Sequence, residues 1–337
     1  MGYILKEIKE QNLSFKIKVY KKNRFFSIKD RLINFFQALI IYGFHLPTAG
    51  FVILDNILLA SAYFKFHPET KVVQVWHSAG VFKKFGLHAC KDPKEREIIR
   101  RANQNLTHII ADSHRYTDII AEAFGVKLDI VLPIGSPRTD FLFNQDSIRS
   151  ATQSFLSKFN DIKHKKKILY APTFREYEEY ELIKLRLELE YLQKNLGQDY
   201  VILIRLHPKK KSQLKLDDKL KNYVIDVSNY ENLEHLLAGV DILVTDYSSI
   251  FLEFIVLMKP IIFYPYDLEE YESKDRGFYF EYQKWVPGKV VNNISDLVKA
   301  ILFAEIDKER YEAFVNQLFD HRDGQASKRF VARVLLK

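Results

Sequence analysis

Cysteine and several familiar ligand-binding motifs are scarce or missing in this chain of 337 residues. The single cysteine, Cys90, excludes a disulfide within the chain and fits a reducing compartment. There is no Gly-x-Gly-x-x-Gly, no Walker loop, no His-Glu-x-x-His and no Cys-x-x-Cys, which argues against a dehydrogenase, a P-loop ATPase and a zinc enzyme. An Asp-x-Asp pair of the kind that holds a divalent metal on a nucleotide-sugar pyrophosphate is also missing. We therefore predict neither a bound metal nor a cofactor.

A long hydrophobic run is missing as well. Residues 32–54 contain no Asp, Glu, Lys or Arg, but Asn34, Gln37, His45 and Pro47 interrupt them, and a bilayer span needs about 20 predominantly apolar residues. We predict instead a helix over residues 28–44, which either packs in the core or docks on an anionic membrane surface. Five basic residues between positions 21 and 31 would help it to dock. Early charges at the N-terminus do not resemble a signal peptide, so we expect a cytoplasmic protein.

The amino-acid composition indicates a packed, basic globular protein. Hydrophobic residues make up 47% of the chain and aromatic residues 14%. Lysine and arginine number 51 against 43 acidic residues, and the net charge of +8 favours anionic partners. A nucleic-acid-binding protein is one alternative, but its aromatic residues should alternate with Lys and Arg on an exposed face. In this chain the aromatic residues fall mostly inside apolar periodic runs, so we expect that the protein does not bind nucleic acid.

Apolar β-rich runs alternate with helical patterns along the chain, which favours an α/β fold with parallel sheets. The length suits two domains of about 150 residues each. The polar, basic stretch 144–167 marks their boundary, so we predict an N-terminal domain over 1–150 and a C-terminal domain over 151–337, with the last helix as a candidate to pack back on the first domain. Predicted strands are 51–54, 72–76, 108–111, 130–133, 168–170, 201–205, 224–226, 242–245 and 261–264. Predicted helices are 93–104, 115–124, 180–196, 233–238, 248–257 and 295–303.

Polar residues gather directly after these strands, where ligands of α/β proteins bind. His77 follows the strand 72–76, and His207 follows 201–205 in the other half. A histidine in that place can exchange a proton near neutral pH, although each alone could be structural. Thr173 and Arg175 follow a third strand, and Arg276 lies beyond a fourth. Arginine is suited to grip phosphate.

Thr-Asp-Tyr-Ser-Ser follows the strand 242–245 and precedes apolar residues at helical spacing. We therefore predict that Ser248 and Ser249 begin a helix as N-cap candidates. A helix N-terminus carries unpaired N–H groups and the positive end of the helix dipole, so it is suited to bind phosphate. The alternative is that the two serines only cap the helix.

Six short motifs, in order, resemble the CDP-glycerol:polyol-phosphate transferases of wall teichoic acid synthesis. They are Gln74-Val-Trp-His77, Gly135-Ser-Pro-Arg-Thr-Asp140, Tyr170-Ala-Pro-Thr-Phe-Arg175, Leu206-His-Pro208, Thr245-Asp-Tyr-Ser-Ser249 and Arg276-Gly-Phe278, and the likeness extends through Asp320-His-Arg-Asp-Gly-Gln-Ala-Ser327. The resemblance implies two facing Rossmann-like domains of GT-B type, with the active site in the interdomain cleft. It also implies roles for matching residues. The catalytic ones are His77 and His207; those on the donor are Thr173, Arg175, Asp246, Ser248, Ser249 and Arg276; those on the acceptor side are Lys83, Lys84 and Arg138.

The implied activity is transfer of glycerol phosphate, or another polyol phosphate, from CDP-glycerol or CDP-ribitol to an undecaprenyl-linked saccharide, with release of CMP. The protein would work at the cytoplasmic face of the cell membrane as a peripheral protein. Residues 76–80 of the chain read Trp-His-Ser-Ala-Gly, where polymerising members of the family usually read Trp-His-Gly-Thr-Pro-Leu-Lys. That form resembles the priming enzymes and favours a primase. A polymerising transferase and a GT-B glycosyltransferase using a nucleotide sugar stay as alternatives.

Overall fold

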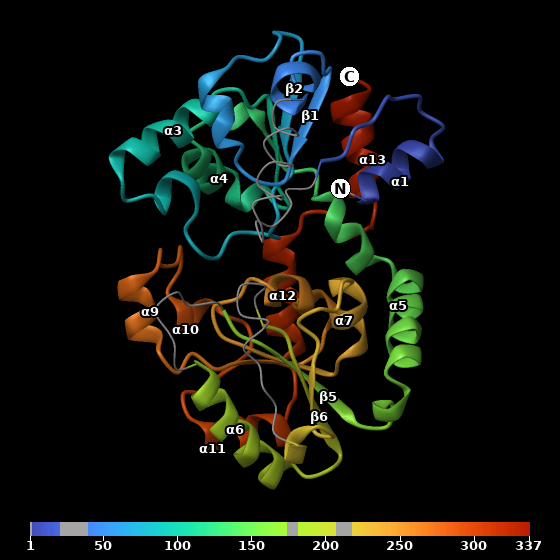
Figure 1. Cartoon of the computed structure of the whole chain (residues 1–337), viewed down its shortest axis with the longest axis vertical. Coiled ribbons are helices and arrows are strands. Elements are labelled where there is room, and N and C mark those ends of the chain that lie inside the picture. Colours follow the sequence, from blue (N-terminus) through green and yellow to red (C-terminus); the bar gives the residue numbers. More distant parts are fainter. Residues whose placement is uncertain (1, 21–39, 174–180, 207–217) are drawn as a thin grey trace. The chain divides into compact units, whose positions relative to one another are not determined.

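The computed structural model describes residues 2–20, 40–173, 181–206 and 218–337 and divides into two compact units (Figure 1). The first unit comprises Met1–His77, Phe85–Asp140 and Gln325–Lys337, and the second Ser78–Lys84 and Phe141–Gly324. The polar stretch taken for a boundary lies inside the second unit, where helix α5 (Gln145–Lys158) occupies much of it. Its buried Phe155 packs against Gly239, so this stretch is amphipathic rather than a linker.

The first unit contains a parallel sheet of four strands in the order β1-β2-β3-β4. Its strands are short, with two to four residues each. Their bounds are β1 (Phe51–Leu54), β2 (Lys71–Gln74), β3 (His108–Ile110) and β4 (Val131–Leu132). Two helices connect them, α3 (Pro93–Asn103) between β2 and β3 and α4 (Thr117–Phe124) between β3 and β4.

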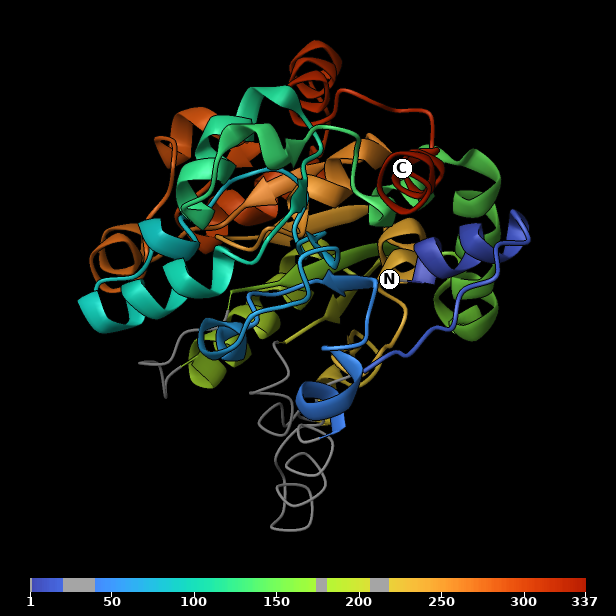
Figure 2. The same cartoon turned by 90° about the horizontal axis from the view of Figure 1, so that it is seen from above.

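Segments far apart in the sequence complete this unit. Helix α1 (Gly2–Glu10) lies beside α13 (Ala326–Phe330), which continues into the π-helical turn Val331–Leu335 (Figures 1 and 2). Ile4, Val73 and Phe330 meet in one cluster with no more than 1% of each side chain exposed. Residues 325–337 are therefore part of the core of the first unit.

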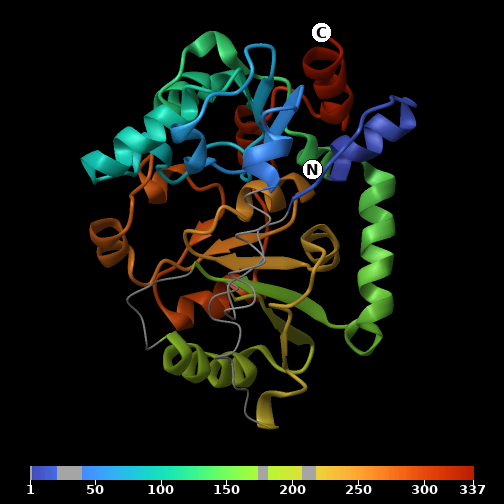
Figure 3. The ribbon, with the colours of Figure 1, turned by 45° about the horizontal axis from the view of Figure 1, so that its top comes forward.

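The second unit contains a parallel sheet of six strands in the order β10-β9-β8-β5-β6-β7 (Figure 3). The chain begins in the middle at β5, proceeds outward through β6 and β7, and then returns to the other side of β5. The order therefore reverses between β5 and β8, and such a switch point is the usual ligand site of an open α/β sheet. The bounds are β5 (Lys166–Ala171), β6 (Tyr200–Ile204), β7 (Val224–Asp226), β8 (Ile242–Thr245), β9 (Ile261–Phe263) and β10 (Lys289–Val290).

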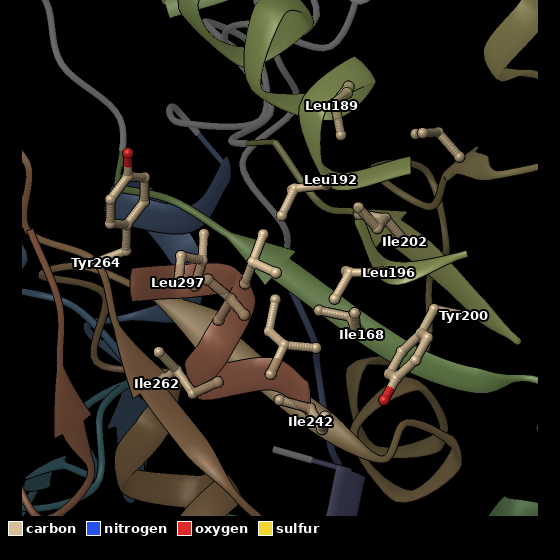
Figure 4. Packing of buried hydrophobic residues seen from close by; sticks show 14 of the residues in the cluster. Ile168, Leu189, Leu192, Leu196, Tyr200, Ile202, Ile242, Ile262, Tyr264 and Leu297 are labelled. Atoms are coloured by element: carbon tan, nitrogen blue, oxygen red, sulfur yellow. The ribbon is translucent and has the colours of Figure 1, made fainter. Parts of the chain in front are cut away.

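Helices cover both faces of this sheet. Helices α6 (Glu181–Leu196) and α11 (Ile294–Leu302) contact each other on one face, and α5 contacts α7 (Leu233–Gly239) on the other (Figure 1). Leu192 of α6 and Leu297 of α11 pack on Ile202 and Ile242 of the strands, with at most 7% of any of these side chains exposed (Figure 4). The second unit also contains α9 (Leu268–Lys274), α10 (Tyr282–Trp285) and α12 (Lys308–Leu318).

The helix predicted over 248–257 begins later than expected. Helix α8 covers Phe251–Phe254, a 3-10 turn over Ile255–Leu257 follows it, and Ile250 occupies the N-cap position without a side-chain cap. The prediction that Ser248 and Ser249 cap this helix is therefore wrong. Tyr247, which directly precedes the two serines, has a fully buried side chain.

Most of the predicted helix 28–44 lies outside the described residues, which resume at Ile40 with a π-helical turn over Ile41–His45. Among the described helices, none combines the length and the apolar character that a bilayer crossing requires.

Candidate functional site

The first unit gathers polar groups where its strands end. Asp55 follows β1 directly, His77 lies three residues beyond β2, and Arg138 lies in the turn after β4. Nδ1 of His77 is 3.0 Å from the carbonyl oxygen of Asp55, and Arg138 donates from Nη1 to the carbonyl oxygen of His77. The structure thus brings His77 and Arg138 together at the carboxyl edge of the first sheet.

The contact with Asp55 sets the tautomer of the His77 ring. A backbone carbonyl can only accept a hydrogen bond, so Nδ1 must carry the proton that it donates. In the neutral ring the lone pair then lies on Nε2, which is the nitrogen that could take a proton from a substrate hydroxyl. His77 is exposed, as such a role requires.

The backbone before His77 is strained. Trp76 has a φ of 56°, in the left-handed region that bulky side chains rarely occupy. Its N–H donates to the side-chain oxygen of the buried Gln74 at 3.0 Å, and its ring lies 4.1 Å from that of His77 and 5.1 Å from that of Phe85. Strain of this kind costs about 1–3 kcal/mol and is concentrated at functional sites. It explains why glutamine and tryptophan precede His77.

The turn after β4 has a structural task besides placing Arg138. Both carboxylate oxygens of Asp140 accept backbone hydrogen bonds from the start of α13, from Ala326 at 2.6 Å and from Ser327 at 2.8 Å. Gly135 adopts a φ of 85°, and a side chain there would press on Ala326. The motif 135–140 therefore closes on Ala326 and Ser327, the last two residues of the sequence resemblance.

In the second unit, Thr173 and Asp246 meet at the switch point between β5 and β8. The backbone N–H of Thr173 donates to Oδ1 of Asp246 at 2.8 Å, and the carbonyl of Asp246 accepts from the hydroxyl of Tyr282 at 2.8 Å. Asp246 is only 2% exposed. Asp246 thus links the two strand-end loops.

Ser248 and Ser249 follow on the same loop and are half-buried. The hydroxyl of Ser248 lies 3.5 Å from the N–H of Ile250, which is long for a hydrogen bond, and the carbonyl of Ser249 accepts from Leu252. Beneath them, Tyr247 donates to Asp267 at 2.9 Å and stacks on Tyr271 at 3.9 Å between ring centroids. The two serines thus lie next to the stacked rings of Tyr247 and Tyr271, at the switch point between β5 and β8.

Arg276 lies on the loop after α9, beside its neighbour Asp275. The Asp275 carboxylate accepts from the backbone N–H of Arg276 at 2.6 Å, and Nε of Arg276 is 3.4 Å away. Lys83 and Lys84, expected on the acceptor side, belong by their contacts to the second unit and pair with this loop. The sequence pattern did not single out Asp275 and Tyr271 of this cluster; the only available signal was the acidic residue next to the Arg-Gly-Phe motif.

Two predicted site residues, Arg175 and His207, lie outside the described residues. Of the remaining residues, no group of three or more His, Cys, Asp or Glu side chains is placed to hold a metal ion.

Comparison with known proteins gives a consistent result. The family model of the CDP-glycerol:poly(glycerophosphate) glycerophosphotransferases matches residues 2–336. The chain is 34% identical to the teichoic acid ribitol-phosphate primase of Bacillus spizizenii, over 85% of this chain and 75% of that protein. It is also 34% identical to the ribitol-phosphate polymerase TarL of Staphylococcus aureus, over 98% of this chain and 58% of TarL. The chain thus spans little more than half the length of this polymerase, and 53% of a second one from Bacillus spizizenii.

Among solved structures, a variant of the wall teichoic acid polymerase TagF soaked with CDPG superposes with a TM-score of 0.79 at 25% identity, covering 99% of this chain and 84% of that one. This match and the two parallel sheets confirm the predicted fold class, an α/β protein with two Rossmann-like domains of GT-B type. The family match covers nearly the whole chain and agrees with relatives above 30% identity. This protein belongs to the CDP-glycerol:poly(glycerophosphate) glycerophosphotransferase family.

Proposed function

We propose that this protein is an enzyme that transfers glycerol phosphate or ribitol phosphate from a CDP-activated donor to a lipid-linked saccharide, in the synthesis of teichoic acid or a related cell-surface polymer. The observation that carries the proposal is the location of the described motif residues of this family at the carboxyl ends of the two sheets. Relatives named for ribitol phosphate and for glycerol phosphate support the class of donor.

In the proposed reaction a hydroxyl oxygen of the acceptor attacks the β-phosphorus of the CDP-polyol in line. The new oxygen–phosphorus bond forms as the bond from that phosphorus to the bridging oxygen of CMP breaks, and CMP leaves. Such transfers depend mainly on positioning and on neutralising charge. Thr173, Ser248, Ser249 and Arg276 would hold the donor diphosphate in the second unit, together with Arg175 and His207.

His77 is our proposed general base. The hydrogen bond from Nδ1 to the Asp55 carbonyl puts the ring lone pair on Nε2, and Nε2 would take the proton of the attacking hydroxyl. Arg138, which contacts the backbone of His77, would hold this residue in place on the acceptor side. A positioned base of this kind contributes about 10²–10⁴-fold in rate.

We propose a priming role because the motif Trp-His-Ser-Ala-Gly resembles the corresponding motif of the enzymes that add the first polyol phosphate. Transfer to an undecaprenyl-linked saccharide would take place at the cytoplasmic face of the membrane.

We also propose a peripheral contact with an anionic membrane, which surface residues of the first unit support. Apolar side chains on the surface of the first unit alternate with basic ones in the segment 15–20, where Ile17 and Val19 are 44% and 53% exposed beside Lys16 and Lys18. Phe44, in the turn after the undescribed residues, is 66% exposed. Insertion of apolar side chains combined with attraction of lysines to anionic lipid is a common form of surface binding.

The activity is tested by incubating the protein with a synthetic lipid-linked disaccharide and, in separate reactions, CDP-glycerol, CDP-ribitol or UDP-sugars. Mass spectrometry of the lipid product and quantification of CMP identify the donor. One added polyol phosphate indicates a primase, and a ladder of masses indicates a polymerase. Product from a UDP-sugar alone would refute the proposal in favour of a glycosyltransferase.

The role of His77 is tested with His77→Ala. We expect transfer to be abolished while calorimetry still detects donor binding within a few-fold of wild type. His114→Ala, at another exposed histidine of the first unit, is a matched control. Loss of donor binding together with activity would instead assign His77 to the donor.

A further inference from the structure

The segment Ser78–Lys84 packs within the second unit, although residues of the first unit flank it on both sides. Phe82 anchors it, with a ring that is 3% exposed and lies 5.0 Å from the ring of Phe251 and 5.4 Å from that of Trp285. Backbone hydrogen bonds join Tyr279 to Phe82 at 3.0 Å and Lys84 to Gly277 at 3.1 Å. The main chain on both sides of Lys83 is therefore fixed against the loop that carries Arg276.

The side chain of Lys83 is held in a network on this loop. Its Nζ donates to the hydroxyl of Tyr271 at 3.1 Å and lies 5.6 Å from the centroid of the same ring. The Tyr271 hydroxyl donates in turn to the carboxylate of Asp275. Asp275 also accepts from Arg276, so Lys83, through Tyr271, and Arg276 directly belong to one network around this carboxylate.

Electrostatics agree with this geometry. Burial alone would raise the pKa of Asp275, but the amide of Arg276 and the charges of Lys83 and Arg276 outweigh burial and hold the pKa below its usual range. Asp275 is therefore ionised at neutral pH, and the three side chains together carry a positive charge. The side chain of Arg276 is 49% exposed, so solvent and ligands can reach the cluster.

We propose that Lys83 binds the diphosphate of the donor together with Arg276, and is not an acceptor-side residue. The inference rests on the proposed function, because it takes the diphosphate of a CDP-polyol as the anion. That diphosphate carries two negative charges, and the cluster of Lys83, Arg276 and Asp275 offers it a net positive charge. Arginine would supply planar, paired hydrogen bonds and lysine a compact point charge. Asp275 and Tyr271 are positioning residues, since they orient the cations.

The test is calorimetric titration of the full-length protein with CDP-glycerol at several salt concentrations. Lys83→Gln should weaken binding by at least about 10-fold and make its salt dependence shallower. Lys83→Arg keeps the charge and should bind within about threefold of wild type, which separates charge from packing. Tyr271→Phe removes the hydroxyl but keeps the stacked ring, and should fall between Lys83→Gln and wild type.

Lys274→Gln is the matched control. This lysine is the last residue of α9, two positions before Arg276, is 49% exposed and pairs with Glu270, so its loss should leave the Kd nearly unchanged. If the Lys83→Gln variant is folded and binds CDP-glycerol as tightly as wild type, this inference is overturned and the proposed function is not. If the variant raises only the KM for the acceptor, Lys83 belongs to the acceptor side. A wild-type protein that binds no CDP-polyol overturns the proposed function and this inference with it.

Discussion

Replacing Asp140 with alanine should loosen the final helical segment of the chain. Helix α13 begins after Gln325, which makes no side-chain cap, so its first N–H groups depend on a residue distant in sequence. Asp140 supplies both acceptors, at 2.6 Å to Ala326 and 2.8 Å to Ser327. Alanine would leave these two N–H groups without their protein acceptor.

The expected loss follows from the chemistry of the two bonds. A hydrogen bond to a charged group contributes about 1.5–3 kcal/mol, and loss of an N-cap costs about 0.5–2 kcal/mol. Because water can partly replace a half-buried acceptor, we expect Asp140→Ala to lower the free energy of unfolding by about 2–4 kcal/mol. Asp140→Asn keeps one neutral acceptor and should cost roughly half as much.

Urea denaturation measures the loss of stability, and hydrogen exchange at Ala326 and Ser327 locates it. Asp146→Ala is a suitable control, because that exposed carboxylate pairs only locally with Arg149 and should change stability by less than about 0.5 kcal/mol. If Asp140→Ala unfolds at the wild-type urea concentration and exchange at both amides is unchanged, the capping argument is wrong.

Three further outcomes are expected. Because neither Ser248 nor Ser249 caps α8, replacing both with alanine should cost less than about 1 kcal/mol in thermal denaturation, yet lower kcat/KM for the donor at least about tenfold if their hydroxyls bind the diphosphate; unchanged kinetics would remove them from the site. Phe82→Ala should cost about 3–4 kcal/mol in urea denaturation, through lost packing against its aromatic neighbours, and a loss below about 1 kcal/mol would contradict its role as the anchor of Ser78–Lys84. Burial, and secondarily Lys71, lowers the pKa of His108 below 6.5, so the stability it contributes is complete above pH 6.5 and is lost as the pH falls through the lowered pKa. His108→Gln should therefore flatten the stability–pH curve on the acid side of neutrality, and an unaltered slope would refute the assignment.

Local sequence pattern predicted the strands well, because most of them are apolar runs buried on both faces. All five residues of β6, Tyr200–Ile204, are buried, for example. Strand β10 escaped prediction because its two residues, Lys289 and Val290, are too few to show a period. The stacking of Tyr247 on Tyr271 beside the start of α8 could not be predicted either, since it joins residues far apart in the sequence.

For the candidate site, the sequence predicted which residues follow the ends of strands, but not which of them contact one another. Sequence indicated that His77 and Arg138 follow different strands, but not that the guanidinium reaches the backbone of the histidine. It placed Lys83 with its neighbours in the first half of the chain, whereas the burial of Phe82 among aromatic rings draws this segment into the second unit. Periodicity reports which face of an element is buried, and it cannot report which distant element covers that face.

The way in which the first unit is assembled has a consequence for its synthesis. Its core cluster combines Ile4 and Val73 with Phe330 and Val334, and the ribosome makes the last two only after the whole of the second unit. All residues of the second unit are therefore made before residues 325–337, whereas the core of the first unit stays incomplete until those residues are added. Pairing of segments so far apart in sequence is also intrinsically slow. The half of the molecule that leaves the ribosome first is thus the half that finishes folding last.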